Sequence, residues 1–184
     1  ENYEGLDLFT VLAHEGYPGH LYQTVYSSTH CANPLQGILS YGGYTEGWAT
    51  YAELYSYGIC RMEEPAARLL MLNKAWALNL YSTIDLGIHY YGWSEYDTYL
   101  FLNSCGITDA ATAREVFLAI VEDPANYLKY YVGYLEFDAL KERARAALGS
   151  NFRLYDFHEY LLSLGPAPFS LLEKKIDEFI ANQD

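Results

Sequence analysis

The sequence predicts an all-α fold. Apolar residues recur at helical spacing in long segments, and prolines, glycines and capping residues stand between those segments. Half of the 184 residues are apolar, which is enough for a sizeable core. This length fits one helical domain, which we assign to residues 1–184.

The first predicted helices flank a break in the chain. Residues 6–13 are apolar enough for a buried helix, which should stop around Pro18. Helix resumes over residues 20–28. Residues 29–43 are rich in turn residues and are expected to form a loop, and a third helix follows over residues 45–57.

The longest predicted helix opens at Glu63-Glu64-Pro65 and runs to about Tyr91. Its apolar residues are nearly continuous, so we expect it to be central and buried. Ser94 and Asp97 form a capping-box-like start for the next helix, and Thr108 is expected to cap the one after. The remaining helices are predicted over residues 95–106, 108–122, 125–148, 154–164 and 169–182.

Two histidines and a glutamate crowd into seven residues, as His14-Glu15 and His20. A His-Glu pair begins the helix motif of zinc peptidases, in which the histidine holds the metal and the glutamate activates a water. The usual second histidine follows four residues later on the same helix face. His20 is six residues on, roughly 120° away round an ideal helix. Pro18-Gly19 should break the helix and swing His20 back toward His14.

Glu46 is the third candidate ligand. It lies 26 residues after His20 on the next predicted helix, and a carboxylate from a following helix completes the ligand set of the glutamate zincins. Thr50 and Glu53 share its helix face, and Glu53 could hold a ligand histidine in place. The alternative is a metal-free turn between two helices, with Glu53 as a surface acid.

Together with later segments, these motifs resemble the bacterial domain-of-unknown-function family 885. The likeness continues, in family order, through Asp85–His89, Gly92–Ser94, Tyr130–Gly133 and Phe157–Glu159. The family is described as zincin-like, so the resemblance implies a zincin-like multi-helix domain with metallopeptidase or carboxypeptidase activity. Its proteins are much longer than this chain. The resemblance therefore implies the C-terminal catalytic portion, with the N-terminal part of the parent protein as a partner.

One departure from the family pattern concerns the helix before Asp85. The family leads us to expect an arginine there, whereas this chain has Asn79 and Tyr81. A role for that arginine in binding a substrate carboxylate is therefore in doubt.

The resemblance and the residues together predict metal-assisted hydrolysis of a peptide substrate. We expect one Zn²⁺ per chain, held by His14, His20 and Glu46, which lowers the pKa of a bound water and polarises the scissile carbonyl. Glu15 is expected to take the proton of that water and pass it to the leaving amine.

Further residues are expected to stabilise the oxyanion and to bind substrate. Tyr131 is the first choice for donating to the developing charge, and Tyr130 is the second choice and a substrate contact. His89, oriented by Asp85 four residues earlier, is expected to act as a transition-state donor beside Tyr131 or as a substrate ligand, and the alternative is a purely structural pair. His158, on an amphipathic C-terminal helix, is expected to be a packed structural residue.

Composition excludes several other classes of function. A net charge of −13 and a pI near 4.6 argue against binding nucleic acid or an anionic membrane surface. Three widely spaced cysteines, Cys31, Cys60 and Cys105, form neither a disulfide framework nor a zinc knuckle. No signal peptide or long apolar run occurs. The compartment and the oligomeric state stay open, although the resemblance implies an exported or envelope-associated parent.

Alternative functions remain open from the sequence. A carboxylate-bridged di-metal oxidase ranks low, because it needs paired Glu-x-x-His units that this sequence lacks. A non-catalytic peptide-binding domain could keep the fold and the broken helix. The same apparatus could also hydrolyse a non-peptide amide or an ester.

Overall fold

The computed structural model describes residues 4–31, 33, 36 and 38–183. Over these residues it contains helices and no strand, which confirms the all-α prediction. The helices are α1 (Glu4–Glu15), α2 (His20–His30), α3 (Gly42–Ser56), α4 (Glu64–His89), α5 (Glu95–Ser104), α6 (Ala110–Glu122), α7 (Asn126–Leu148), η2 (Gly149–Asn151), α8 (Leu154–Ser163) and α9 (Phe169–Ala181).

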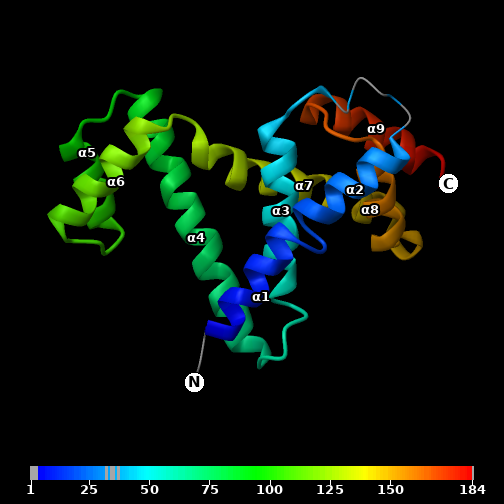
Figure 1. Cartoon of the computed structure of the whole chain (residues 1–184), viewed down its shortest axis with the longest axis horizontal. Helices are drawn as coiled ribbons and strands as arrows, with labels where there is room; N and C mark the ends of the chain where they lie inside the picture. The colour runs from blue at the N-terminus through cyan, green and yellow to red at the C-terminus, as the bar shows by residue number, and fades with distance from the viewer. Residues whose placement is uncertain (1–3, 32, 34–35, 37, 184) are drawn as a thin grey trace.

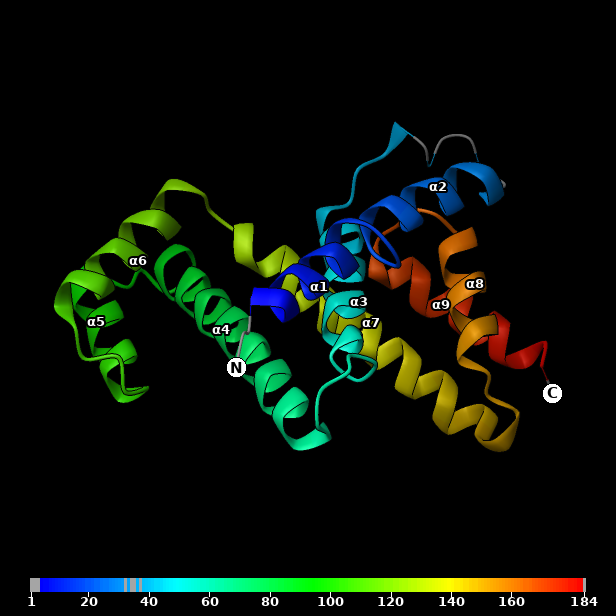
Figure 2. The same cartoon turned by 60° about the horizontal axis from the view of Figure 1, so that its bottom comes forward.

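The helices form two groups joined by α7. Helices α3 and α4 diverge from the short connection between them, and α7 spans the opening and crosses α3 (Figure 1). Helices α5 and α6 pack near the far end of α4, whereas α2, α8 and α9 gather around α3 and α7 (Figure 2). Helix α1 lies along α3, on the side that faces α4.

Each group has its own apolar core. The larger core lies among α3, α7, α8 and α9, and its buried residues include Tyr44, Trp48, Phe137, Phe157, Leu161 and Leu172. The smaller core joins α4, α5 and α6 through Ile84, Leu102, Ala113 and Ile120. Helix α7 therefore contributes its C-terminal half to the larger core and reaches the other group with its N-terminal end.

Helices α3 and α7 meet with their backbones in contact. A Cβ atom on Gly47 would lie 2.5 Å from the carbonyl carbon of Gly133, and a Cβ atom on Gly133 would lie 2.7 Å from the Cα atom of Gly47. No side chain fits in that space, so glycine is required on both sides of the crossing. This crossing fixes the distance between α3 and α7.

Two helices are less buried than the sequence predicts. On α1, Leu8 is 61% exposed and Val11 and Leu12 are also exposed, and on α4 Leu69 is 67% exposed. The prediction that both helices are buried is therefore wrong for these faces. The density of apolar residues does not tell which face a neighbouring helix will cover, and α1 packs chiefly against α3 alone.

The described helices include none with both the length and the apolar character that crossing a lipid bilayer requires.

Helix caps agree with the sequence at one position and differ at another. Ser94 and Asp97 form a complete capping box at the start of α5, as predicted. Helix α6 is capped by Asp109, whose Oδ2 accepts a hydrogen bond of 2.7 Å from the Thr112 N–H. The prediction of Thr108 as the cap is wrong by one residue.

His158 is half-buried and packs against aromatic side chains of α3. It lies against Trp48, and its Nε2 is in a 2.9 Å hydrogen bond with the Tyr51 hydroxyl. Burial, with a smaller effect of the Lys141 charge, lowers the pKa of His158 from 6.5 to about 4. The imidazole is therefore neutral at neutral pH.

The α3–α7 crossing gives the first prediction. Gly47→Ala and Gly133→Ala should each lower the free energy of unfolding by about 1–3 kcal/mol, because the added methyl group forces the two backbones apart. Gly5→Ala is the control, since nothing lies within 4 Å of its added Cβ atom. Urea unfolding followed by circular dichroism measures all three, and equal stability of the variants and the control would refute the close contact.

His158 gives a prediction on pH. Its pKa is lower in the folded chain than in the unfolded one, so its contribution to stability is complete above about pH 6.5 and is lost as the pH falls to about 4. The loss amounts to about 3 kcal/mol over that window. His158→Gln should flatten the dependence of unfolding free energy on pH, whereas His30→Gln, at an exposed histidine, should not. An unchanged slope in His158→Gln would contradict the assignment.

Candidate metal centre

Three helices bring the predicted ligands together. His14 lies in the last turn of α1, His20 is the first residue of α2, and Glu46 lies in the first turns of α3. One donor atom from each of the three lies within 4.8 Å of the others. The Glu46 Oε2 is 3.2 Å from the His20 Nε2 and 3.7 Å from the His14 Nε2.

The chain breaks between α1 and α2, as Pro18-Gly19 predicts. The Tyr17–Pro18 peptide bond is cis, and the Pro18 carbonyl accepts a 2.9 Å hydrogen bond from the Trp48 Nε1–H. A Cβ atom on Gly19 would overlap the carbonyl oxygen of His14, so only glycine allows the returning chain to approach the end of α1. The approach brings the rings of His14 and His20 to 4.8 Å, centroid to centroid.

The second ring nitrogen of His14 contacts the buried carboxylate of Glu53. The Nδ1 atom of His14 lies 3.0 Å from Glu53 Oε2, and Lys74 Nζ of α4 lies 2.8 Å from Glu53 Oε1. Burial alone would raise the pKa of Glu53, but the hydrogen bonds from His14 and Lys74 outweigh it and hold the pKa below its ordinary value. The contact with Glu53 orients the imidazole so that its Nε2 faces Glu46 and His20.

The donor set fits a zinc ion. Two imidazole nitrogens and one carboxylate oxygen are zinc donors, and three protein ligands leave a position for water or substrate. Donors at zinc–ligand distances near 2.1 Å can be at most about 4.2 Å apart. Both distances from Glu46 are already within that limit, and the donor nitrogens of His14 and His20, which lie within 4.8 Å of each other, would have to approach by up to about 0.6 Å on binding. Glu53 contacts the non-ligating nitrogen of His14, as carboxylates commonly do behind zinc-bound histidines.

A cavity of about 390 Å³ adjoins His14. Its walls come from α1, α3, α4 and α7, and they include Val11, His14, Glu15, Thr50, Glu53, Lys74, Leu78, Asn126, Tyr127 and Tyr130. Glu15 is exposed on this wall, one residue from a candidate ligand. The cavity therefore brings the exposed Glu15 carboxylate and one of the three candidate ligands, His14, to the same space.

Of the two neighbouring tyrosines, the structure brings Tyr130 to the site. Its ring is stacked on His14 with 6.2 Å between centroids. Burial and the neighbouring carboxylates of Glu46 and Glu15 raise the pKa of the Tyr130 phenol, so its hydroxyl stays protonated and able to donate. Tyr131 instead lies 6.1 Å from Tyr134, and no hydrogen bond or ring contact within the described residues joins it to the three ligands. Its role as the donor stays a prediction.

The Asp85–His89 pair forms as expected but does not line the cavity. Asp85 Oδ1 accepts from His89 Nδ1 at 2.8 Å and from the Ala125 N–H at 3.0 Å. His89 follows the cavity residue Leu78 by eleven positions on α4, which is roughly 16 Å along a helix axis. The visible effect of Asp85 is to fasten the start of α7 to α4, and the catalytic role of His89 stays a prediction.

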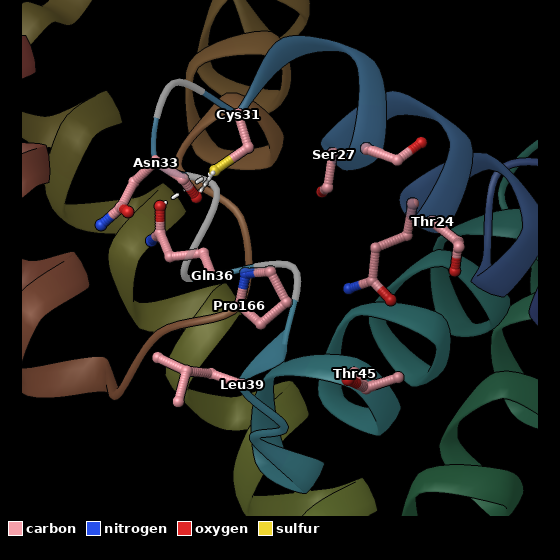
Figure 3. Close-up of a pocket in the computed structure, with 10 residues that line it drawn as sticks. Thr24, Ser27, Cys31, Asn33, Gln36, Leu39, Thr45 and Pro166 are labelled. Atoms are coloured by element: carbon pink, nitrogen blue, oxygen red, sulfur yellow. Dashed lines mark hydrogen bonds between the residues drawn. The ribbon is translucent and has the colours of Figure 1, made fainter.

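A second cavity lies between α2 and the start of α3. It measures about 330 Å³ and is lined by uncharged residues, among them Thr24, Ser27, Cys31 and Thr45 (Figure 3). The Cys31 thiol donates to Gln36 Oε1 at 2.9 Å across its rim. None of the three candidate ligands lines it, so we place the chemistry in the first cavity.

Sequence reasoning missed Lys74. It contacts Glu53 from another helix, 21 residues further along the chain. No local spacing links the two residues. The sequence shows Lys74 only as one of two lysine or arginine residues on the long apolar helix.

Comparisons with known proteins identify the chain at the level of a family. The profile of the family described as "Bacterial protein of unknown function (DUF885)" matches residues 1–176. No curated protein matches the chain.

Two solved structures are similar to this one. The "putative lipoprotein from Colwellia psychrerythraea" is 28% identical, with a TM-score of 0.79 over 94% of this chain and 30% of that chain. A "putative lipoprotein of unknown function from Shewanella oneidensis" is also 28% identical, with a TM-score of 0.72 over 95% of this chain and 31% of that chain. The chain thus spans less than a third of the length of each.

The Lys74–Glu53 contact gives a prediction on stability. Glu53→Gln should cost about 1–3 kcal/mol of unfolding free energy, because the buried acid bonds to both His14 and Lys74. Lys74→Met should cost less, since the ammonium group is partly exposed, and the two changes should couple by about 1 kcal/mol in a double-mutant cycle. The exposed pair Lys175 and Glu178 is the matched control and should show no measurable coupling. Additive effects at Glu53 and Lys74 would contradict the contact.

Proposed function

The chain belongs to the bacterial DUF885 family, and from its candidate metal centre we propose that it is the metal-binding part of a zinc-dependent hydrolase of peptide bonds. The observation that carries the proposal is the convergence of His14, His20 and Glu46 from three separate helices, with donor atoms within 4.8 Å of one another. A cluster of this composition beside a cavity with a free carboxylate supports hydrolysis over metal storage.

His14, His20 and Glu46 would hold one zinc ion. When bound, zinc would polarise the scissile carbonyl and lower the pKa of a water molecule. Glu53 holds the His14 ring in the orientation that such binding needs. The break at Gly19 would also support zinc binding, because it brings His20 within reach of Glu46.

Two residues of the cavity wall would transfer the proton and stabilise the developing negative charge. Glu15 is exposed there and would take a proton from the attacking water and pass it to the leaving amine. The Tyr130 hydroxyl would donate to the carbonyl oxygen as negative charge develops. Tyr130 is favoured over Tyr131 for this role, because only Tyr130 contacts His14.

The cavity also suits part of a peptide. Its volume of about 390 Å³ falls in the range of small-molecule sites, and Val11, Leu78 and Tyr127 give it apolar walls. It can therefore receive a side chain next to the scissile bond. The same apparatus would serve a non-peptide amide or an ester, and a substrate panel separates these classes.

Metal content tests the proposal. The purified, dialysed chain should hold about one zinc by plasma mass spectrometry, and His14→Ala, His20→Ala and Glu46→Ala should each lose it, because each removes one of three ligands. His30→Ala, at an exposed histidine, is the control and should keep the metal. A chain that takes up no zinc after reconstitution would refute the proposal.

Turnover is tested with Glu15→Gln. This variant should keep zinc and lose hydrolysis of a peptide library by at least about 10²-fold, because it removes the general base and leaves the ligands in place. Equal rates in the parent chain and in Glu15→Gln would contradict the assigned base. Zinc binding without turnover in the parent chain would favour the non-catalytic binding domain.

A further inference from the structure

One face of α2 joins the candidate metal centre to the second cavity. Thr24, Ser27 and Cys31 line this cavity, which measures about 330 Å³. His20 begins the same row, because the four residues follow one another at spacings of four, three and four along the helix. Thr24 therefore lies one turn beyond the candidate ligand, about 6 Å along the helix axis.

Helix α3 makes a second connection between the cavity and the metal centre. Thr45 lines the cavity and directly precedes the candidate ligand Glu46. Figure 3 shows Thr24 and Thr45 on one side of the cavity, away from Cys31. The metal centre thus adjoins the first cavity through one histidine ligand and the second cavity through neighbours of the other two ligands.

The second cavity is polar but uncharged. Its described lining residues include no lysine, arginine, histidine, aspartate or glutamate, and its polar groups are side-chain amides, hydroxyls and one thiol. The first cavity differs, because Glu15, Glu53 and Lys74 line it. A charged group that entered the second cavity would lose hydration without gaining a counter-charge, which is unfavourable. This cavity therefore favours an uncharged polar group.

Three side chains near the metal centre have groups available for a ligand. Gln23 is 4% exposed, and its Nε2 donates to the Tyr44 carbonyl at 3.3 Å, which leaves its Oε1 as an acceptor. The hydroxyls of Thr24 and Thr45 form no hydrogen bond within the part of the chain that the structure describes. Together they offer an acceptor for an N–H group and two donors for a carbonyl oxygen, which complements a side-chain amide.

We propose that Gln23, Thr24 and Thr45 form a specificity subsite for an uncharged amide side chain of the substrate. The inference rests on the proposed hydrolase function. It specifies the substrates as peptides with glutamine or asparagine near the scissile bond, and it disfavours glutamate and aspartate at the same position.

The distance from the metal centre sets which substrate residue reaches the subsite. Thr24 lies about 6 Å along α2 from His20. One extended residue spans about 3.3–3.6 Å. The subsite therefore receives a side chain about two residues from the scissile bond, and the first cavity receives the part of the peptide on the other side of that bond.

Isothermal titration calorimetry on Glu15→Gln, which does not consume peptides, measures the preference with and without zinc. The host peptide is acetyl-Ala-Ala-Phe-Leu-Ala-Ala amide, which has no charged terminus, and each alanine in turn is replaced by glutamine or glutamate. At one position glutamine should bind about tenfold more tightly than alanine, because it gains hydrogen bonds to the protein. Glutamate should bind no more tightly than alanine there, because its carboxylate loses hydration.

Substitutions identify the residues responsible. Thr24→Lys, at an exposed position, should reverse the selectivity, so that glutamate binds about tenfold more tightly than glutamine. The double variant Thr24→Val with Thr45→Val should abolish the preference for glutamine over alanine, and it covers the case in which the lysine distorts the helix. Thr29→Lys adds the same charge to α2 at an exposed position outside the cavity, so it is the control and should keep the preference for glutamine.

The outcomes separate this inference from the proposed function. Equal binding of the glutamine, glutamate and alanine peptides at every position, no binding of any peptide, or a glutamine preference that survives the double variant would each overturn the subsite. A glutamine preference in a chain unable to bind zinc would support the subsite and refute the zinc hydrolase. Zinc binding without any preference would do the reverse.

Discussion

The contact between Gly47 and Gly133 sets the geometry of the site. Because no side chain separates α3 from α7 there, the two helices cross at backbone distance. Glu46 directly precedes Gly47, and Tyr130 precedes Gly133 by three residues, about one turn. The crossing therefore brings the candidate carboxylate ligand and the tyrosine that stacks on His14 to the same side of the fold.

Helix α3 contributes one face to the cavity and another to the larger core. Glu46, Thr50 and Glu53 recur at spacings of four and three and share one face, from which Thr50 and Glu53 line the cavity. Trp48 faces the larger core and also donates to the Pro18 carbonyl, so the core holds the break that positions His20. The larger core and the candidate metal centre thus both depend on helix α3.

Local features were predictable and tertiary ones were not. The break at Pro18-Gly19 and the shared face of Glu46 and Glu53 follow from backbone constraints and helix periodicity, which act over a few residues. Lys74 reaches Glu53 only because α4 folds back beside α3, and no spacing in the sequence encodes that. Neighbouring residues of a helix point about 100° apart, so choosing Tyr130 over its neighbour required the position of α1.

Glu53 connects the two halves of the molecule through a single carboxylate. One of its oxygens contacts His14 of α1 and the other contacts Lys74 of α4. The aperture of the cavity depends on the angle at which α4 diverges from α3 (Figure 1). Any hinge motion of α4 would pull on Lys74, and through Glu53 it would turn the imidazole of His14. The width of the cavity and the orientation of a candidate metal ligand would in this way be mechanically linked.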